Sequence, residues 1–286
     1  MVDLIKLHDA QLKFWRGDVG KQWAANQAHL DQMLEPMGNA MLEAVAPRPG
    51  ERVLDIGCGC GATSFQAAEW VGDNGWVTGL DLSPDMIDVA KAKVATNGLR
   101  NVAFALSDAA TRAFEPEWDL VMSRFGVMFF GDPATAFGNL RHALKPTGRL
   151  GFVCWRAAAD NQWISVPLAA ASDIIELPNP PHPNAPGPFA LANPDRINAI
   201  LSGAGFSQIK ITAVDRKLSM RFDDDDPCSR AAEFLVEFGP LSHILGNADQ
   251  ASRTRVKQRL PEVLGAFETE GTMTLSGAGW LVSATL

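Results

Sequence analysis

The chain has 286 residues, of which 47% are hydrophobic and 20% charged, a composition typical of a globular protein with one sizeable core. Its formal net charge of -8 argues against a duplex nucleic-acid partner, because that affinity comes mostly from lysine and arginine side chains that neutralise phosphates. No apolar run approaches the roughly 20 residues of a membrane-spanning helix, and residues 1–30 carry no signal-like segment, so we expect no stable membrane insertion.

The first 46 residues are expected to be helical. Apolar residues from Leu30 to Val45 recur at helical spacing, and Pro36 interrupts them. The pattern predicts two short helices that pack on the core or over its edge.

Residues 51–155 show the alternation that defines an α/β fold. Short β-branched runs alternate with helical ones, which is typical of βαβ units on a mainly parallel sheet. Two helix starts are marked by an N-cap oxygen before a proline, at Ser83-Pro84 and Asp132-Pro133. Strands are expected at 52–56, 76–80, 102–106, 118–122 and 149–155.

The alternation ends after Trp155. Residues 177–189 hold six prolines, too many for a helix or a central strand, and are expected to form a loop. Asn193-Pro194-Asp195 then predicts the start of a helix that ends at Gly203. A strand at 206–214, a helix at 248–267 and a final strand at 272–286 complete the expected elements.

The most informative stretch follows the first predicted strand and reads VLDIGCGCGATS. Glycines at 57, 59 and 61 permit a sharp turn into a helix and bring bare amide groups close to a ligand. The spacing from Gly57 to Ala62 also fits the fingerprint of a dinucleotide site. The glycines alone therefore leave a dinucleotide and a smaller adenosine ligand open.

Asp55 distinguishes these two ligands on electrostatic grounds. At the end of its strand, its carboxylate would repel a pyrophosphate but attract a ligand with an ammonium and a sulfonium group. S-adenosylmethionine carries both groups. Asp81, at the end of the second strand, is placed to accept hydrogen bonds from two ribose hydroxyls, which supports either adenosine ligand. Asp108 and Ala109 follow the third strand and could bind adenine, although Asp108 could equally be an N-cap.

Several motifs in order resemble the class I S-adenosylmethionine-dependent methyltransferases, of the small-molecule type found in ubiquinone and menaquinone biosynthesis. The motifs are VLDIGCGCGATS, GLDLSPDMIDVA, ALSDAAT, DLVMSRFGVMFFGDPATAFGNLRHALKPTGRL and the closing strand. The resemblance is good from Trp15 to Trp155 and looser beyond. It implies a Rossmann-like seven-stranded mixed sheet in the order 3-2-1-4-5-7-6, with the last strand antiparallel and helices on both faces. It also implies one domain, divided as an N-terminal helical cap (1–46), a donor-binding half (47–156), a proline-rich insertion after strand 5 (157–195) and the rest of the sheet (196–286).

The resemblance also implies the residues that bind the methyl donor. Asp55 and the three loop glycines would hold the methionine moiety, and Ser123 would touch it through its backbone. Arg124 could meet the donor carboxylate or a substrate acid unless it forms a rim salt bridge. The donor-binding set is Asp55, Gly57, Gly59, Gly61, Asp81, Leu82, Asp108, Ala109, Ser123 and Arg124. Cys58 and Cys60 fit as small loop residues, so no metal is expected; with Cys154 and Cys228 they form no disulfide framework, which suits a cytoplasmic protein.

The expected reaction is an in-line displacement of a methyl group onto a small aromatic or apolar acceptor. None of the five histidines is assigned as a catalytic base. The expected acceptor contacts are Trp15, Trp23, Phe125, Met128, Phe129 and Trp163. The competing functions are an NAD(P)-dependent oxidoreductase and a protein that binds the donor without catalysis; a small-molecule substrate and a homodimer are the expected partners.

Overall fold

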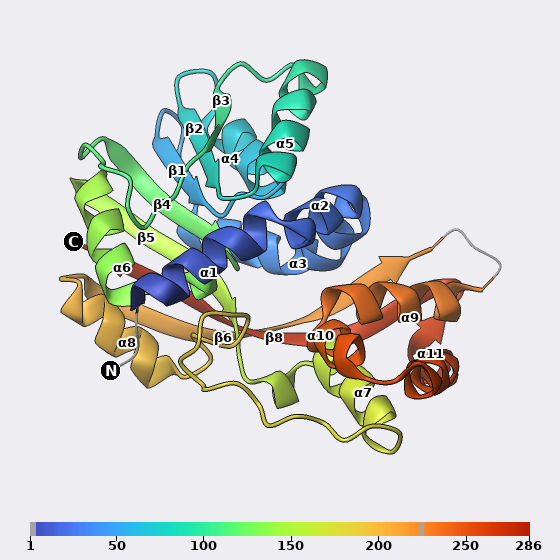
Figure 1. The fold of residues 1–286 in the computed structure, drawn as a ribbon. Helices are drawn as coiled ribbons and strands as arrows, with labels where there is room; N and C mark the ends of the chain where they lie inside the picture. The colour runs from blue at the N-terminus through green and yellow to red at the C-terminus, as the bar shows by residue number, and fades with distance from the viewer. Residues whose placement is uncertain (1–3, 223–225) are drawn as a thin grey trace.

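A twisted sheet forms the centre of the molecule, in a computed structural model that describes residues 4–222 and 226–286 (Figure 1). The strand order is β3-β2-β1-β4-β5-β8-β6, with β7 pairing with β8 only. Strands β1 to β5 pair in parallel, and β8 runs antiparallel to both β5 and β6. This order matches the one that the resemblance implies, with β8 in the place of strand 7 and β6 in the place of strand 6. The strands are β1 Arg52–Ile56, β2 Trp76–Asp81, β3 Val102–Leu106, β4 Trp118–Arg124, β5 Leu144–Trp155, β6 Ser207–Arg221, β7 Glu268–Thr269 and β8 Thr272–Thr285.

Helices cover both faces of this sheet, as neighbouring residues of β5 show. Successive side chains of a strand point to opposite faces. A Cβ atom at Gly151 would meet Val45 of α3 at 2.0 Å, whereas the ring of Phe152 lies 5.5 Å from that of Phe137 in α6. The helices are α1 Leu4–Arg16, α2 Asp18–Ala25, α3 Gln27–Val45, α4 Ala62–Val71, α5 Pro84–Asn97, α6 Pro133–Ala143, α7 Gln162–Ser172, α8 Pro194–Gly203, α9 Pro227–Phe238, α10 Pro240–Asn247 and α11 Gln250–Leu264, with short 3-10 turns at Val127–Phe129, Ala158–Asp160 and Gly265–Phe267.

The helix starts follow the capping signals in the sequence. The side chain of Ser83 accepts a hydrogen bond from the amide of Met86 at the start of α5, and Asp132 does the same for Thr135 at the start of α6. Asn193 caps α8 in this way too, and α8 ends at Gly203 as expected. These caps place the three helices where the sequence predicted them.

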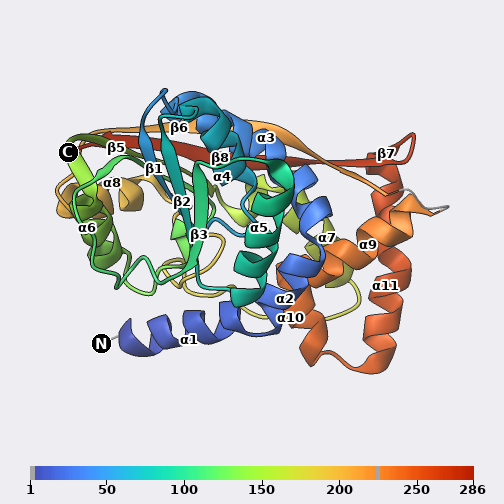
Figure 2. The same cartoon turned by 90° about the horizontal axis from the view of Figure 1, so that it is seen from above.

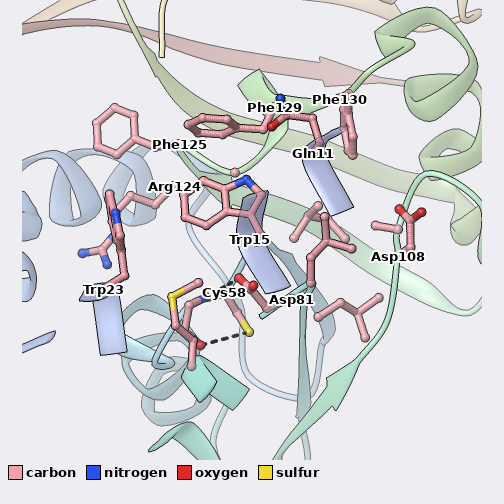
Figure 3. A pocket seen from close by; sticks show the side chains of 18 of the residues that line it. Gln11, Trp15, Trp23, Cys58, Asp81, Asp108, Arg124, Phe125, Phe129 and Phe130 are labelled. Carbon is pink, nitrogen blue, oxygen red and sulfur yellow. Dashed lines mark hydrogen bonds between the residues drawn. The ribbon is translucent and has the colours of Figure 1, made fainter. Parts of the chain in front are cut away.

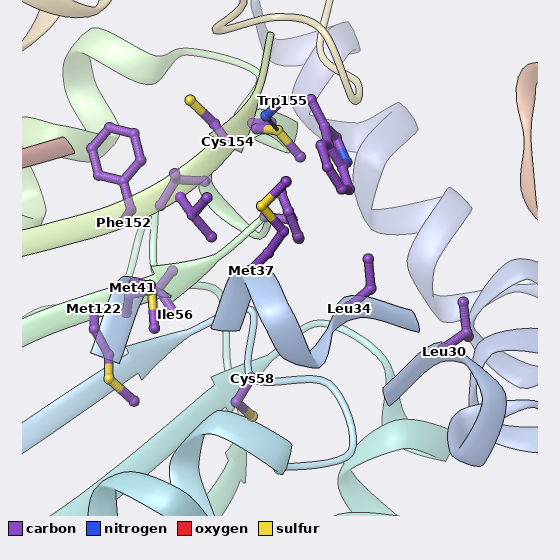
Figure 4. Close-up of a cluster of buried hydrophobic side chains, with 14 of the residues drawn as sticks. Leu30, Leu34, Met37, Met41, Ile56, Cys58, Met122, Phe152, Cys154 and Trp155 are labelled. Carbon is purple, nitrogen blue, oxygen red and sulfur yellow. Dashed lines mark hydrogen bonds between the residues drawn. The ribbon is translucent and has the colours of Figure 1, made fainter. Parts of the chain in front are cut away.

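Helix α3 corrects the expectation of two short helices. It runs without a break through Pro36 and packs on β4, β5, β6 and β8 (Figure 4). A proline inside a helix costs about 3 kcal/mol, but burying one methionine side chain contributes about 1.5–3 kcal/mol. Met33, Met37 and Met41 lie on both sides of the proline and are at most 3% exposed. Burial on the sheet therefore outweighs the lost hydrogen bond.

The C-terminal region holds helices that the sequence pattern did not reveal. Residues 177–189 form a loop, as predicted, but α7 precedes it and α9 and α10 lie between β6 and α11. Helices α7, α9, α10 and α11 pack on one another beside the far end of the long β6–β8 pair (Figure 1). The division of the domain into four segments stays a prediction. Within the ranges described, none of the helices is long and apolar enough to cross a bilayer.

Candidate active site

A pocket lies at the carboxyl ends of β1 to β4, and α1 and α2 cover it (Figures 2 and 3). The space between its lining atoms, including the open solvent at the mouth, is about 1070 Å³. Trp15 projects from α1 into its centre, with the rings of Phe125 and Phe129 on one side and Asp81 on the other (Figure 3). The expected donor-binding residues that line it are Gly57, Gly59, Asp81, Leu82, Asp108, Ala109 and Arg124.

The glycine loop is held tightly against the second strand. The amides of Gly57 and Cys58 both donate to the carbonyl of Leu80, at 2.8 and 3.1 Å. Gly57, Gly59 and Gly61 all have positive φ, at 65°, 55° and 89°. A Cβ atom at Gly57 would lie 2.7 Å from Cα of Gly126, whereas at Gly59 its nearest neighbour is a sulfur 3.7 Å away. Gly57 is therefore required for packing, and Gly59 for its backbone conformation.

Gly61 does not line the pocket, and its expected contact with the donor stays a prediction. It precedes α4 as the N-cap, and a Cβ atom there would meet the ring of Phe104 at 2.6 Å. Glycine is needed here because the chain turns into α4 with a positive φ and because the ring of Phe104 leaves no room for a Cβ atom. Cys58 and Cys60 are buried between these glycines, and burial raises the pKa of Cys60 to about 12. Both thiols therefore serve as small packing groups.

Asp81 shapes the loop as well as facing the pocket. One carboxylate oxygen accepts from the amide of Gly59 at 2.8 Å, and the other from the amide of Ser83 at 2.9 Å. Burial raises the pKa of Asp81, against the opposing effect of these hydrogen bonds. A carboxylate oxygen can accept more than one hydrogen bond, so both retain capacity for a ligand hydroxyl.

Asp55 does not line the pocket, although the sequence predicted that its carboxylate faces the ligand. The side chain is fully buried, and its Oδ2 accepts from the hydroxyls of Thr63 at 2.8 Å and Ser64 at 2.6 Å. Its Oδ1 has no hydrogen-bond partner among the described residues. Asp55 therefore anchors the first turn of α4 to the end of β1.

The buried carboxyl of Asp55 predicts a measurable dependence of stability on pH. Burial raises its pKa to about 6 from an ordinary value of 3.8, so the folded state binds this proton more tightly than the unfolded state does. The unfolding free energy of the protein relative to an Asp55→Asn variant should fall by up to about 3 kcal/mol as the pH rises from below 4 to above 6. Urea unfolding of both proteins across that range measures the difference, and parallel curves would contradict it.

Asp108 lies at the opposite end of the pocket from Trp23 and is engaged on both oxygens (Figure 3). Its Oδ1 accepts from the amide of Ala110 at 2.9 Å, and its Oδ2 lies 2.9 Å from Nε2 of His8 in α1. Asp108 thereby caps a turn and not a helix, because no helix lies between β3 and β4. The contact with His8 ties the covering helix to the end of β3.

Ser123 and Arg124 end β4 and differ in their position. Ser123 is fully buried and does not line the pocket, and its expected backbone contact with the donor stays a prediction. Its hydroxyl donates to the carbonyl of Ile56 at 2.7 Å and accepts from the amide of Gly126 at 3.1 Å. It thereby fixes the turn against the glycine loop. Arg124 faces the pocket and forms an ion pair of 3.1 Å with Asp31.

Four of the six expected acceptor residues line the pocket: Trp15, Trp23, Phe125 and Phe129. The ring of Trp15 contacts those of Phe129 and Trp23 edge to face, with centroids 4.9 and 5.7 Å apart. Phe125 has a positive φ of 65°, unusual for a bulky residue, and stacks on Trp155 at 4.0 Å.

Met128 and Trp163 lie behind this wall and do not line the pocket, and the acceptor contact expected for each stays a prediction. The sulfur of Met128 accepts from the amide of Trp155 at 3.4 Å, and the rings of Trp163 and Trp155 lie 5.2 Å apart. Both residues therefore act on the pocket only through the support that they give to Trp155.

Sequence reasoning missed the polar residues that the covering helices contribute. His8 and Gln11 of α1 lie in the lining with Trp15, as do Gln27 and Asp31 of α3. Their spacing of three, four and seven residues places each set on one face of its helix. This spacing could have revealed the two faces, but their mixed polar and aromatic composition obscured it. Across residues 4–222 and 226–286, no three His, Cys, Asp or Glu side chains gather as a metal site would require.

The comparisons with known proteins agree with this geometry. Residues 47–164 match the model of a family described as a methyltransferase domain. The chain is 30% identical over 196 residues to nocamycin O-methyltransferase from Saccharothrix syringae. The aligned region covers 65% of this chain and 70% of that protein. It is 41% identical over 122 residues to aklanonic acid methyltransferase DauC from a Streptomyces strain. This aligned region covers 42% of this chain and 56% of that protein.

The fold is shared with solved methyltransferases at lower identity. The phosphoethanolamine N-methyltransferase 2 of Haemonchus contortus, solved with S-adenosyl-L-methionine, aligns with a TM-score of 0.58 and 19% identity over 98% of this chain and 60% of that one. The chain belongs to the class I S-adenosylmethionine-dependent methyltransferases. Proteins of ubiquinone and menaquinone biosynthesis are among its relatives, so the resemblance read from the motifs is confirmed.

Proposed function

We propose that this protein transfers a methyl group from S-adenosylmethionine to an oxygen atom of a small aromatic or apolar metabolite. The observation that carries the proposal is the joining of two unlike surfaces in one pocket. Asp81 and the bare loop of Gly57 and Gly59 suit a nucleoside, and the rings beside them suit a flat apolar partner. The names of the two relatives, one of them an O-methyltransferase, support oxygen as the acceptor atom.

The chemistry requires positioning more than proton transfer. The acceptor oxygen forms a bond to the methyl carbon while the carbon–sulfur bond breaks, and the electron pair of that bond stays on sulfur. An oxygen that is already ionised, as in a carboxylate or an enolate, needs no base from the protein. Holding the two reactants in line can contribute about 7–11 kcal/mol. Trp15 and Phe129 would hold the acceptor, and α1 would exclude water.

The two competing functions have less support. An oxidoreductase would need a pyrophosphate at the glycine loop and a group that assists hydride transfer, and the matched family model describes methyltransferases. A protein that binds the donor without catalysis would not require a second, aromatic-lined space beside it. We also infer a cytoplasmic location from the four free cysteines. A homodimer stays a prediction that light scattering would test.

The proposal is tested with a radiolabelled methyl donor and a panel of phenols, carboxylic acids, quinols and amines. We expect label in an ether or an ester, which alkaline hydrolysis distinguishes. Transfer to amines alone, or no transfer to any acceptor by protein that binds S-adenosylhomocysteine, would contradict it.

A change in the aromatic wall should affect the acceptor and spare the donor. Removing the ring of Phe129 takes away apolar contact worth about 1.5–3 kcal/mol, so Phe129→Ala should raise the KM for the acceptor by about tenfold or more. The matched control is Phe14→Ala, because Phe14 lies on α1 next to Trp15 but is 45% exposed. Equal KM values for both variants would show that the acceptor binds elsewhere.

A further inference from the structure

Gln11 of α1 brings a polar group to the aromatic side of the pocket. It lines the pocket beside Phe129 and Phe130, on the side of Trp15 that lies away from Asp81 (Figure 3). Its side-chain oxygen, Oε1, is shielded from water and has no hydrogen-bond partner in the part of the chain that the structure describes. Buried polar atoms are nearly always paired, so an unpaired one in a pocket wall calls for an explanation.

This oxygen differs from the other unpaired polar atoms of the interior. Over residues 4–222 and 226–286, the buried side-chain atoms without a partner are Oε1 of Gln11, Nε of Arg52 and Oδ1 of Asp55. Neither Arg52 nor Asp55 lines the pocket, whereas Gln11 does. Gln11 is therefore the residue of this set that a ligand in the pocket can reach.

The polar side chains nearest along the covering helices are already engaged. His8 lies one turn before Gln11 on α1, and its Nε2 is 2.9 Å from Oδ2 of Asp108. Gln27 of α3 donates its side-chain amide to Asp31. Neither His8 nor Gln27 could turn to Oε1 of Gln11 without giving up this contact. The missing hydrogen-bond donor is thus expected from a ligand.

The chemistry of a carboxamide determines which ligand group suits Gln11. A carboxamide oxygen accepts a hydrogen bond, but it is too weak a base to take a proton. The acceptor oxygen that reacts is already ionised or loses its proton to water, so a hydrogen bond from it to Gln11 would hold back the proton that has to leave. A hydroxyl that does not react has no such conflict. The aromatic rings beside Gln11 suit the flat ring that carries this hydroxyl.

We propose that Gln11 is a specificity-determining residue, which selects an aromatic acceptor with a hydroxyl group besides the oxygen that reacts. The inference rests on the proposed function and narrows its substrate class from flat apolar rings to hydroxylated ones. A pocket with a buried hydrogen-bonding group rejects an analogue that lacks the matching hydroxyl, because the group is then left unpaired. The selection therefore comes from α1 and not from the sheet.

The test compares rings that differ by one hydroxyl, with a radiolabelled methyl donor. The pairs are catechol, resorcinol and hydroquinone against phenol, the naphthalenediols against the naphthols, and salicylic acid against benzoic acid. We expect the wild type to favour at least one hydroxylated member by about tenfold or more in kcat/KM. This exceeds the advantage of about twofold that two equivalent hydroxyls give by number alone. Gln11→Leu should reduce the preference to about twofold or less.

Binding of S-adenosylhomocysteine separates this role from a contact with the donor. Calorimetry should give the same Kd for Gln11→Leu and the wild type. A Kd raised by about tenfold or more would place Gln11 in the donor site and overturn the inference. Gln11→Met has about the same length and also lacks the oxygen, and it serves if Gln11→Leu does not fold.

Gln22→Leu is the matched control, because it makes the same change on α2, where Gln22 is exposed and does not line the pocket. It should match the wild type on every ring. A wild type without the preference, or a Gln11→Leu variant that keeps it, would overturn the inference and leave the proposed function standing. No transfer to any ring by protein that binds S-adenosylhomocysteine would overturn both.

Discussion

Asp81→Ala is expected to weaken binding of S-adenosylhomocysteine at least tenfold. Asp81 ends β2 and lines the pocket, and we propose that its carboxylate accepts from the two ribose hydroxyls. Hydrogen bonds to a charged group contribute about 1.5–3 kcal/mol each, so the loss of one already corresponds to about tenfold. The substitution also frees the amide of Gly59, which now donates to Asp81 at 2.8 Å. Isothermal titration calorimetry measures the change.

The matched control for this experiment is Asp85→Ala. Asp85 lies in the first turn of α5, four residues further along, and does not line the pocket. It should bind the ligand with wild-type affinity. If Asp81→Ala does so too, the ribose must lie elsewhere, and the assignment of the pocket's nucleoside end would be wrong.

Gly57→Ala should damage both folding and donor binding. The alanine would have to adopt a φ of 65°, and its Cβ atom would lie 2.7 Å from Cα of Gly126, a backbone atom that cannot rotate away. Strain at such a φ costs about 1–3 kcal/mol and overpacking costs about as much again, so we expect a loss of about 3 kcal/mol or more in the unfolding free energy. The glycine loop would also shift away from the donor. Urea unfolding and calorimetry measure the two effects.

Gly98→Ala separates the strain from the clash. Gly98 also has a positive φ, of 70°, but a Cβ atom there would have no neighbour within 4 Å. It should lose about 1 kcal/mol of stability and keep full donor binding. Equal losses for the two variants would mean that the close approach of Gly57 to Gly126 has no energetic weight.

Much of the sheet could be predicted because its local signals agree with the fold. Each of the strands β1 to β4 contains a short apolar run, as do residues 149–155 of β5. The caps at Ser83 and Asp132 mark the starts of α5 and α6 where the structure has them. The strand order came from the resemblance, since residue patterns alone do not determine which strands lie side by side.

The errors arose where tertiary packing decides the outcome. Pro36 is a local signal to end a helix, but burial of the methionines around it keeps α3 intact. Asp55 has the residue type and position of a ligand contact, yet the hydroxyls of Thr63 and Ser64 compete for its carboxylate and turn it inward.

The covering helices were the least predictable part of the site. His8, Gln11 and Trp15 belong to α1, which has no buried residue and therefore no core pattern to reveal its position. Their role follows from the placement of α1 over the strand ends (Figure 2). Sequence spacing defines a helix face but not the surface on which that face lies.

A calorimetric titration of the wild-type protein with S-adenosylhomocysteine and, separately, with NADH tests the central claim most directly. The pocket described above predicts saturable binding of S-adenosylhomocysteine at one site per chain, and no binding of NADH that competes with it. Tight binding of NADH alone would contradict the account, because it would place a pyrophosphate at the glycine loop.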